Sequence, residues 1–143
     1  MNVVLLDDHL LRDLLSDEVP GELSPLLSDH GAATTNLYLH RLCKSVVSAR
    51  GGALTGTWSA EQRRSLGRQL LELPDEIEVV PIRQLAFRMA EIADVHRVST
   101  LGAEAAAAAE HLGAVVCVWE GADRPGIRGA ISAVGADYRT VAR

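Results

Sequence analysis

The chain begins MNVVLLDDHLL, residues 1–11, an apolar run that leads directly into two carboxylates and then into helix-forming leucines. A continuous apolar run of this length is typical of a buried parallel strand. In open α/β sheets, ligands bind beyond the carboxyl ends of the strands. The sequence therefore places Asp7 and Asp8 where an α/β protein has its ligand site. The same two residues also fit a simpler role, as the cap of the helix that follows.

The rest of the chain alternates strand patterns with helical patterns. Strands are predicted at 3–6, 32–35, 77–80, 115–118 and 138–141. Helices are predicted at 8–15, 20–30, 36–47, 59–74, 82–93, 101–112 and 125–135, whereas 53–58 has the composition of a loop. Caps are expected at Asn36, Ser59 and Ser99, and a helix end at Gly113. This order predicts one domain over residues 1–143, a three-layer α/β/α sandwich around a mostly parallel sheet, with a flavodoxin-type fold as the alternative.

Composition argues against several classes of protein. Hydrophobic residues make up 48% of the chain and aromatic residues only 3%, so the core must be aliphatic and rich in alanine. A base-stacking surface needs more aromatic rings than this, and a net charge of −5 argues against a general polyanion binder. Cys43 and Cys117 lack CxxC spacing, which indicates buried thiols and not a zinc site or disulfide framework. Without a signal peptide or a membrane-length apolar run, the sequence predicts a cytoplasmic protein that does not enter a membrane.

Three acidic residues fall where the predicted elements should meet. Asp7 follows the first strand, Glu104 lies in the first turn of an alanine-rich helix, and Asp123 lies in the turn after strand 115–118. Carboxylates placed in this way can converge on a hard divalent cation, which prefers oxygen ligands and can orient water for attack on a phosphodiester. Taken singly, Glu104 also suits a positive helix end and Asp123 a turn. Neither GxxxxGK[ST], GxGxxG nor HExxH is present, so a nucleotide cradle or a zinc protease site is not indicated.

These features resemble the PIN domain, the fold of VapC-type toxin ribonucleases from bacterial toxin–antitoxin pairs. Residues 3–7, VVLLD, are similar to the family's first strand and its metal-binding Asp. Residues 101–114, LGAEAAAAAEHLGA, resemble the family's alanine-rich helix, and residues 115–123, VVCVWEGAD, resemble its next strand and acidic turn. The resemblance covers nearly the whole chain. It implies Mg²⁺- or Mn²⁺-dependent cleavage of RNA, with Asp7, Glu104 and Asp123 as catalytic metal ligands and Asp8 or Glu120 assisting.

The acidic set departs from the family pattern at several positions. No acid occurs between residues 34 and 60, where the family has one in the helix after the second strand. The third family acid would fall at Gly102, two residues before Glu104, and strict register places Trp119 at the fourth. Two functions remain open. One is a VapC-type metal-dependent endoribonuclease; the other is a degenerate PIN-like module that binds a protein or RNA partner without cleaving, since fewer carboxylates weaken the binding of hard cations.

The expected partners follow from the resemblance and from two groups of residues. RNA contacts are predicted at Arg41, Lys44, Arg63 and Arg64, in a stretch where basic residues outnumber acids, although a solvated helical face is the simpler interpretation. VapC-like proteins pair with an antitoxin and with themselves, so a cognate antitoxin and a homodimer are expected. Leucines at positions 10, 11, 14, 15, 23, 26 and 27 would form an apolar patch for a partner helix, unless all of them belong to the core.

Overall fold

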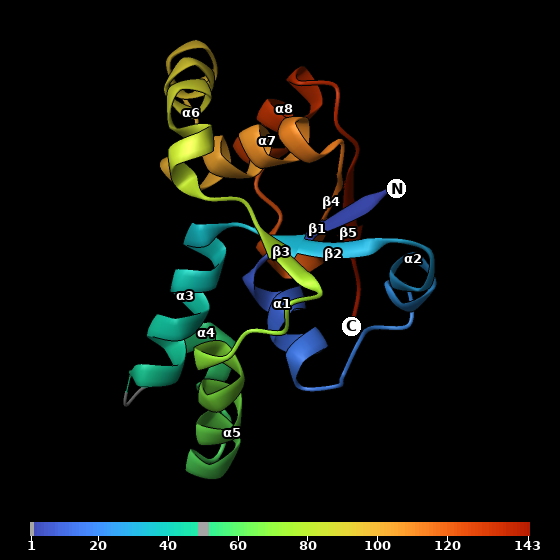
Figure 1. Ribbon diagram of the computed structural model, residues 1–143, viewed down its shortest axis with the longest axis vertical. Helices are drawn as coiled ribbons and strands as arrows, with labels where there is room; N and C mark the ends of the chain where they lie inside the picture. Colours follow the sequence, from blue (N-terminus) through green and yellow to red (C-terminus); the bar gives the residue numbers. More distant parts are fainter. Residues whose placement is uncertain (1, 49–51) are drawn as a thin grey trace.

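The computed structural model describes residues 2–48 and 52–143, in which five parallel strands form one central sheet (Figure 1). In spatial order the strands are β3 (Ile77–Val79), β2 (Gly31–Thr34), β1 (Val3–Leu6), β4 (Val115–Trp119) and β5 (Tyr138–Val141). All neighbouring strands run parallel, and Leu5 of the central β1 lies beside Ala33 on one side and Val116 on the other. The predicted α/β class with a mostly parallel sheet is confirmed.

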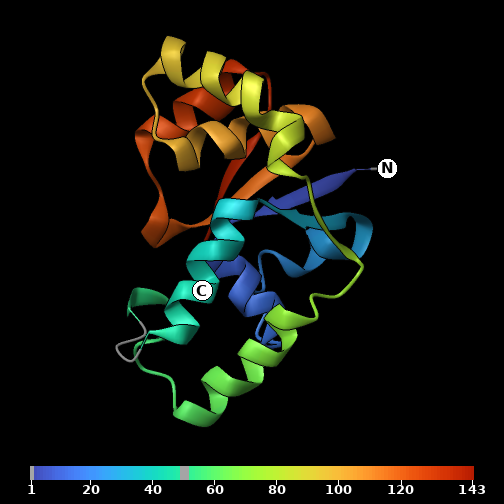
Figure 2. The ribbon, with the colours of Figure 1, turned by 60° about the vertical axis from the view of Figure 1, so that its left-hand side comes forward.

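Helices cover both faces of the sheet and complete the predicted three-layer α/β/α sandwich (Figure 2). One face is covered by α6 (Ile82–His96), α7 (Thr100–Leu112) and α8 (Pro125–Ala133). The opposite face is covered by α1 (Asp8–Leu15), α2 (Ser24–Asp29), α3 (Asn36–Val47), α4 (Gly52–Thr55) and α5 (Ala60–Leu71). A short 3-10 turn, η1 (Glu120–Ala122), follows β4.

Strand side chains alternate between two buried faces. Leu5 and Val116 pack toward α6, α7 and α8, whereas Val4, Leu6 and Cys117 pack toward α1 and α2. A parallel strand covered by helices on both sides has no polar face, which explains the uninterrupted apolar run of β1. Residues 105–109 of α7 are all buried, because this helix contacts the sheet, α6 and α8. Alanine at these positions lets the neighbouring elements approach α7 closely.

Most predicted boundaries hold to within two residues. Ser59 forms the predicted capping box at the start of α5, Ser99 caps α7, and Gly113 ends α7 in the left-handed conformation. The cap of α3 was predicted one residue too late. Thr35 is the cap, through its side-chain oxygen, which leaves the Asn36 amide free for a tertiary contact. The second helix is shorter than predicted, and α6 extends three residues further.

α4 occupies part of the segment for which the sequence predicts a loop. Contacts with α1 and α3 fix this single turn. Leu54 is buried and its carbonyl accepts a hydrogen bond from the Arg12 guanidinium, while the Thr55 hydroxyl donates to the Ser45 carbonyl at 3.0 Å. One turn of helix is not stable by local propensity alone. The loop prediction is therefore wrong here because distant residues stabilise the turn.

The leucines of residues 10–27 belong to the core and form no free patch. Leu10, Leu11, Leu15 and Leu23 are buried, and the other three are half-buried against the same clusters. The predicted apolar surface for a partner helix is therefore wrong at this position. The large exposed apolar side chains lie elsewhere, at Val47, Leu71, Ile82, Phe87 and Val95. Within the described ranges, no helix is both long and apolar enough to cross a membrane.

Candidate functional site

Asp7 lies buried at the carboxyl end of β1 and also caps α1. Its Oδ1 accepts a hydrogen bond from Leu10 N at 2.8 Å, and its Oδ2 accepts one from Trp119 N at 3.1 Å. Both interpretations of this residue, strand end and helix cap, are confirmed. Burial raises the pKa of Asp7 to about 7 against the effect of the two backbone hydrogen bonds, and the nearby Asp8 carboxylate adds to the rise. At neutral pH the group therefore populates both protonation states.

Asp8, the first residue of α1, has one buried oxygen that accepts no hydrogen bond. Its Oδ1 accepts from His9 N at 3.0 Å. Among the described residues no donor is aligned with Oδ2, although Arg41 Nε lies 3.1 Å from it. Burial raises the pKa of Asp8, and the Arg41 guanidinium opposes this rise. A buried acceptor without a donor costs about 1–3 kcal/mol in desolvation, and more when charged. The charge of Asp8 is therefore balanced by the ion pair with Arg41, and its Oδ2 atom has almost no surface accessible from the pocket.

Glu104 is fully buried and binds the start of α3. Its Oε1 accepts from Leu37 N and its Oε2 from Asn36 Nδ2, each at 2.9 Å. The Asn36 Nδ2 group also donates to Val80 O at 2.7 Å, so the carboxylate links α7 and α3 to the residue after β3. Because α7 begins at Thr100, Glu104 lies in the second turn of the helix and not in the first, as the sequence predicted.

Asp123 follows η1, and both of its carboxylate oxygens are engaged by neighbouring side chains. Arg128 Nη2 donates to Oδ2 at 2.9 Å, and the Tyr138 hydroxyl donates to Oδ1 at 2.8 Å. The hydrogen bond from Arg128, followed by the one from Tyr138, lowers the pKa of Asp123. The Arg128 guanidinium also lies 4.7 Å from the centre of the Tyr138 ring. Asp123 thus joins the start of α8 to β5.

The carboxylates of the three acids predicted to share a metal ion are each held by other groups of the protein. Over residues 2–48 and 52–143, no group of three or more His, Cys, Asp or Glu side chains is arranged to hold a metal ion. The position of the third family acid, Gly102, has no room for a side chain. A Cβ there would overlap Val98 and lie 2.9 Å from Ile127 Cγ1. As arranged, the predicted acids do not fit a Mg²⁺ or Mn²⁺ site.

A pocket of about 350 Å³ lies beside Asp7 and Asp8, and three arginines contribute to its lining. They are Arg41 from α3, Arg97 directly after α6, and Arg124 directly before α8. The lining also includes residues from the first turns of α7 and α8. Helix N-termini favour anions because their first N–H groups lack intrahelical acceptors. The pocket therefore combines two carboxylates with groups that attract phosphate.

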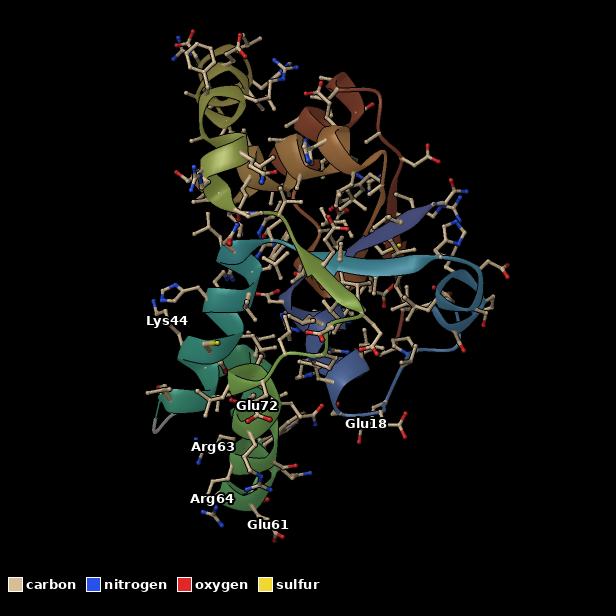
Figure 3. The ribbon with its side chains drawn as sticks, in the orientation of Figure 1. Glu18, Lys44, Glu61, Arg63, Arg64 and Glu72 are labelled. Atoms are coloured by element: carbon tan, nitrogen blue, oxygen red, sulfur yellow. The ribbon has the colours of Figure 1, made fainter. Side chains whose placement is uncertain are left out.

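The predicted RNA contacts divide between this pocket and a more distant surface. Arg41 lines the pocket and pairs with Asp8. Lys44 is exposed one turn further along α3. Arg63 and Arg64 lie near the N-terminus of α5, which is the end of that helix further from the sheet (Figure 3). Sequence reasoning missed Arg97 and Arg124. The Arg-Pro pair that opens α8 was visible in the sequence, but nothing local indicated that its arginine would line the same pocket as Asp7 and Asp8.

Trp119 packs beside Asp7 at the position where strict register places the fourth family acid. The His9 ring lies 4.5 Å from the Trp119 ring, and the Arg143 guanidinium lies 4.5 Å above it. A Cβ at Gly121 would overlap the indole. Burial lowers the pKa of His9 to about 4, so this imidazole is neutral at physiological pH. Glu120, the other predicted assisting residue, is exposed on η1 and does not line the pocket.

Comparison with known proteins supports the fold. No family model and no curated protein matches the chain. The crystal structure of PAE2754 from Pyrobaculum aerophilum is similar, with a TM-score of 0.55 over 96% of this chain and 92% of that chain. The two sequences are 15% identical, so the similarity concerns the fold alone.

Proposed function

We propose that this chain is a PIN-like domain that binds single-stranded RNA in the pocket beside Asp7 and Asp8 and does not cleave it through a metal-dependent mechanism. One observation carries the proposal. The protein itself occupies two of the three predicted metal ligands, Glu104 and Asp123, while arginines line the pocket around the remaining acid. This arrangement suits the binding of a phosphate and lacks a converging carboxylate set.

The charges of the pocket indicate how RNA would bind. Arg41, Arg97 and Arg124 supply three positive charges against the carboxylates of Asp7 and Asp8. The chain as a whole has a net charge of −5, so attraction to RNA would be local to this face. Contacts between arginine and phosphate make affinity strongly dependent on salt. A concave pocket of this size accepts one strand of the sugar–phosphate backbone more readily than a rigid duplex.

A VapC-type, Mg²⁺- or Mn²⁺-dependent endoribonuclease is the second candidate. The observation that favours it is the pair of adjacent buried carboxyl groups, Asp7 and Asp8, that line the pocket after β1, of which Asp7 has its pKa raised to about 7. For this function the Asp123 carboxylate would have to give up its hydrogen bonds from Arg128 and Tyr138 in order to bind a metal ion. An antitoxin and a homodimer as partners belong to this candidate.

Binding is tested by fluorescence anisotropy with labelled single-stranded RNA in EDTA. Arg124→Ala should weaken binding about 3- to 10-fold and reduce the dependence of log Kd on log salt by about one, as expected for one lost phosphate contact. Arg139→Ala is the matched control, because Arg139 is an exposed arginine on β5 outside this pocket. No binding by the wild type, or equal losses in both variants, would contradict the proposal.

Cleavage is tested on the same RNA with Mg²⁺ or Mn²⁺ and again in EDTA, using wild type and Asp7→Asn. The proposal expects intact RNA in every reaction. Cleavage that requires the metal and disappears in Asp7→Asn would establish the second candidate and overturn the first. Cleavage that persists in Asp7→Asn would show that another site or a contaminant cuts the RNA.

A further inference from the structure

We propose that two copies of this chain associate through the outer face of α6, with the two helices packed side by side and antiparallel. The outer face consists of Arg83, Phe87, Ala90 and Asp94. None of the four lines the pocket of the candidate site, so the proposal does not depend on the proposed function. It also concerns a different surface from the leucines of residues 10–27, which belong to the core.

α6 has one face in the core and an opposite face in solvent. Leu85, Met89 and Ile92 form the buried face, and the helix lies at the edge of the molecule in both views (Figures 1 and 2). Phe87 is two residues from both Leu85 and Met89, a rotation of about 200° around the helix, so it lies on the opposite face. Its side chain is 81% exposed. A single exposed apolar side chain is common on protein surfaces, and the charges around Phe87 are what make this face specific.

The charges of the outer face are separated along the helix. Arg83 lies near its N-terminus and Asp94 near its C-terminus, and both are exposed. Over residues 2–48 and 52–143, neither of them forms an ion pair. An antiparallel second copy would bring each Arg83 opposite the partner's Asp94, whereas a parallel copy in register would bring like charges together. The separation of charge therefore favours a second copy of this chain in the antiparallel orientation.

The same register accommodates the phenyl ring. When Arg83 lies opposite the partner's Asp94, Phe87 lies opposite the partner's Ala90, because both pairs are centred on the same point of α6. The four residues are spaced by four, three and four positions, which keeps them on one strip of the helix. The small alanine leaves room for the ring. The two Phe87 residues would be about 4.5 Å apart along the helix axis, close enough for their rings to contact each other.

This arrangement meets the requirements of a two-fold symmetric interface. Such an interface uses the same patch on both copies, so the patch must be complementary to itself. Here the apolar contacts lie at the centre and the ion pairs at both ends, as in the core and rim of known interfaces. One pair of short helices buries less than the roughly 1,200 Å² of a standard interface, so the dimer should be weak, with a Kd on the order of 10–100 µM.

Sedimentation velocity over concentrations that span this Kd tests the proposal. Wild type should change from monomer to dimer as its concentration rises. Phe87→Asp should weaken association at least about tenfold, because it removes the central ring and places two carboxylates near the two-fold axis. Leu71→Asp is the matched control, since Leu71 is 88% exposed but lies on α5, and it should leave association unchanged. Both residues are exposed, so circular dichroism should show an unchanged fold in both variants.

Exchange of the charges tests the orientation of the helices. Arg83→Asp and Asp94→Arg should each weaken association about threefold or more, because each places like charges opposite one another. The double variant should restore the wild-type Kd, since the opposite charges face each other again. A wild type that stays monomeric overturns the proposal, as does a dimer that survives Phe87→Asp or is weakened equally by Leu71→Asp. A double variant that does not regain association overturns the antiparallel register. Absence of RNA binding would overturn the proposed function and leave this result unaffected.

Discussion

Replacing Asp7 with asparagine should change the pH dependence of stability, because Asp7 is a buried carboxyl group that lines the pocket and has a raised pKa. Burial raises its pKa from 3.8 to about 7 in the folded protein. The folded state therefore retains the proton to higher pH than the unfolded chain does. The free energy of unfolding that depends on this proton is fully present below pH 3.8 and is lost as pH rises to about 7.

The size of this effect follows from the two pKa values. At about 1.4 kcal/mol per pKa unit, ionisation of Asp7 lowers the free energy of unfolding by about 4 kcal/mol in total. About 2–3 kcal/mol of this loss falls between roughly pH 5 and pH 8. Asparagine does not titrate, so the stability of the variant relative to wild type should improve by about 2–3 kcal/mol over that range. Its NH₂ group faces either Leu10 N or Trp119 N, which are both donors, and this adds a cost of about 1–3 kcal/mol at every pH.

The measurement is urea unfolding of wild type and Asp7→Asn at both pH values, followed by circular dichroism. The quantity compared is the change, from one pH to the other, in the difference in free energy of unfolding between the two proteins. The pH-independent cost of the asparagine cancels in this change. Asp29→Asn, at an exposed carboxylate on α2, is the control and should show little change. A difference for Asp7→Asn that stays constant within about 0.5 kcal/mol, or shifts in favour of wild type, would refute the assignment of a raised pKa to this group.

Three further predictions concern the same region. RNA affinity of the wild type should weaken as pH rises through about 7, because ionised Asp7 repels phosphate. Asp7→Asn should abolish this pH dependence in anisotropy titrations, and a pH dependence that persists in the variant would show that another group causes it. Glu104→Gln should lower the free energy of unfolding by about 1–3 kcal/mol, since its NH₂ group must face a donor from Asn36 or Leu37. RNA affinity should not change, and weaker RNA binding without a loss of stability would place Glu104 in the binding site. Gly102→Ala should also cost about 1–3 kcal/mol in urea unfolding, through overlap with Val98, and an unchanged midpoint would contradict the close packing described there.

The sequence alone was sufficient for the order and type of most elements, because these depend on local patterns. The apolar run of β1 and the alanine-rich composition of α7 reflect burial of these elements, and both patterns can be recognised from consecutive residues in the sequence. The capping box at Ser59 and the left-handed Gly113 depend on residues within one turn. The position of Asp7 at the end of β1 follows from the same local reasoning.

The arrangement of the candidate site depended on the tertiary structure. Glu104 was expected beside Asp7, but its hydrogen-bond partners lie 67 and 68 residues away in the chain. The pocket that Arg97 and Arg124 line together with Asp7 and Asp8 likewise joins segments that no periodicity connects. The sequence shows which side chains follow a strand, but the partner of a charged group is decided by whichever donors the packed helices bring within hydrogen-bond distance. A carboxylate removed from water must accept such donors or remain unpaired, and only the folded chain determines which of these occurs.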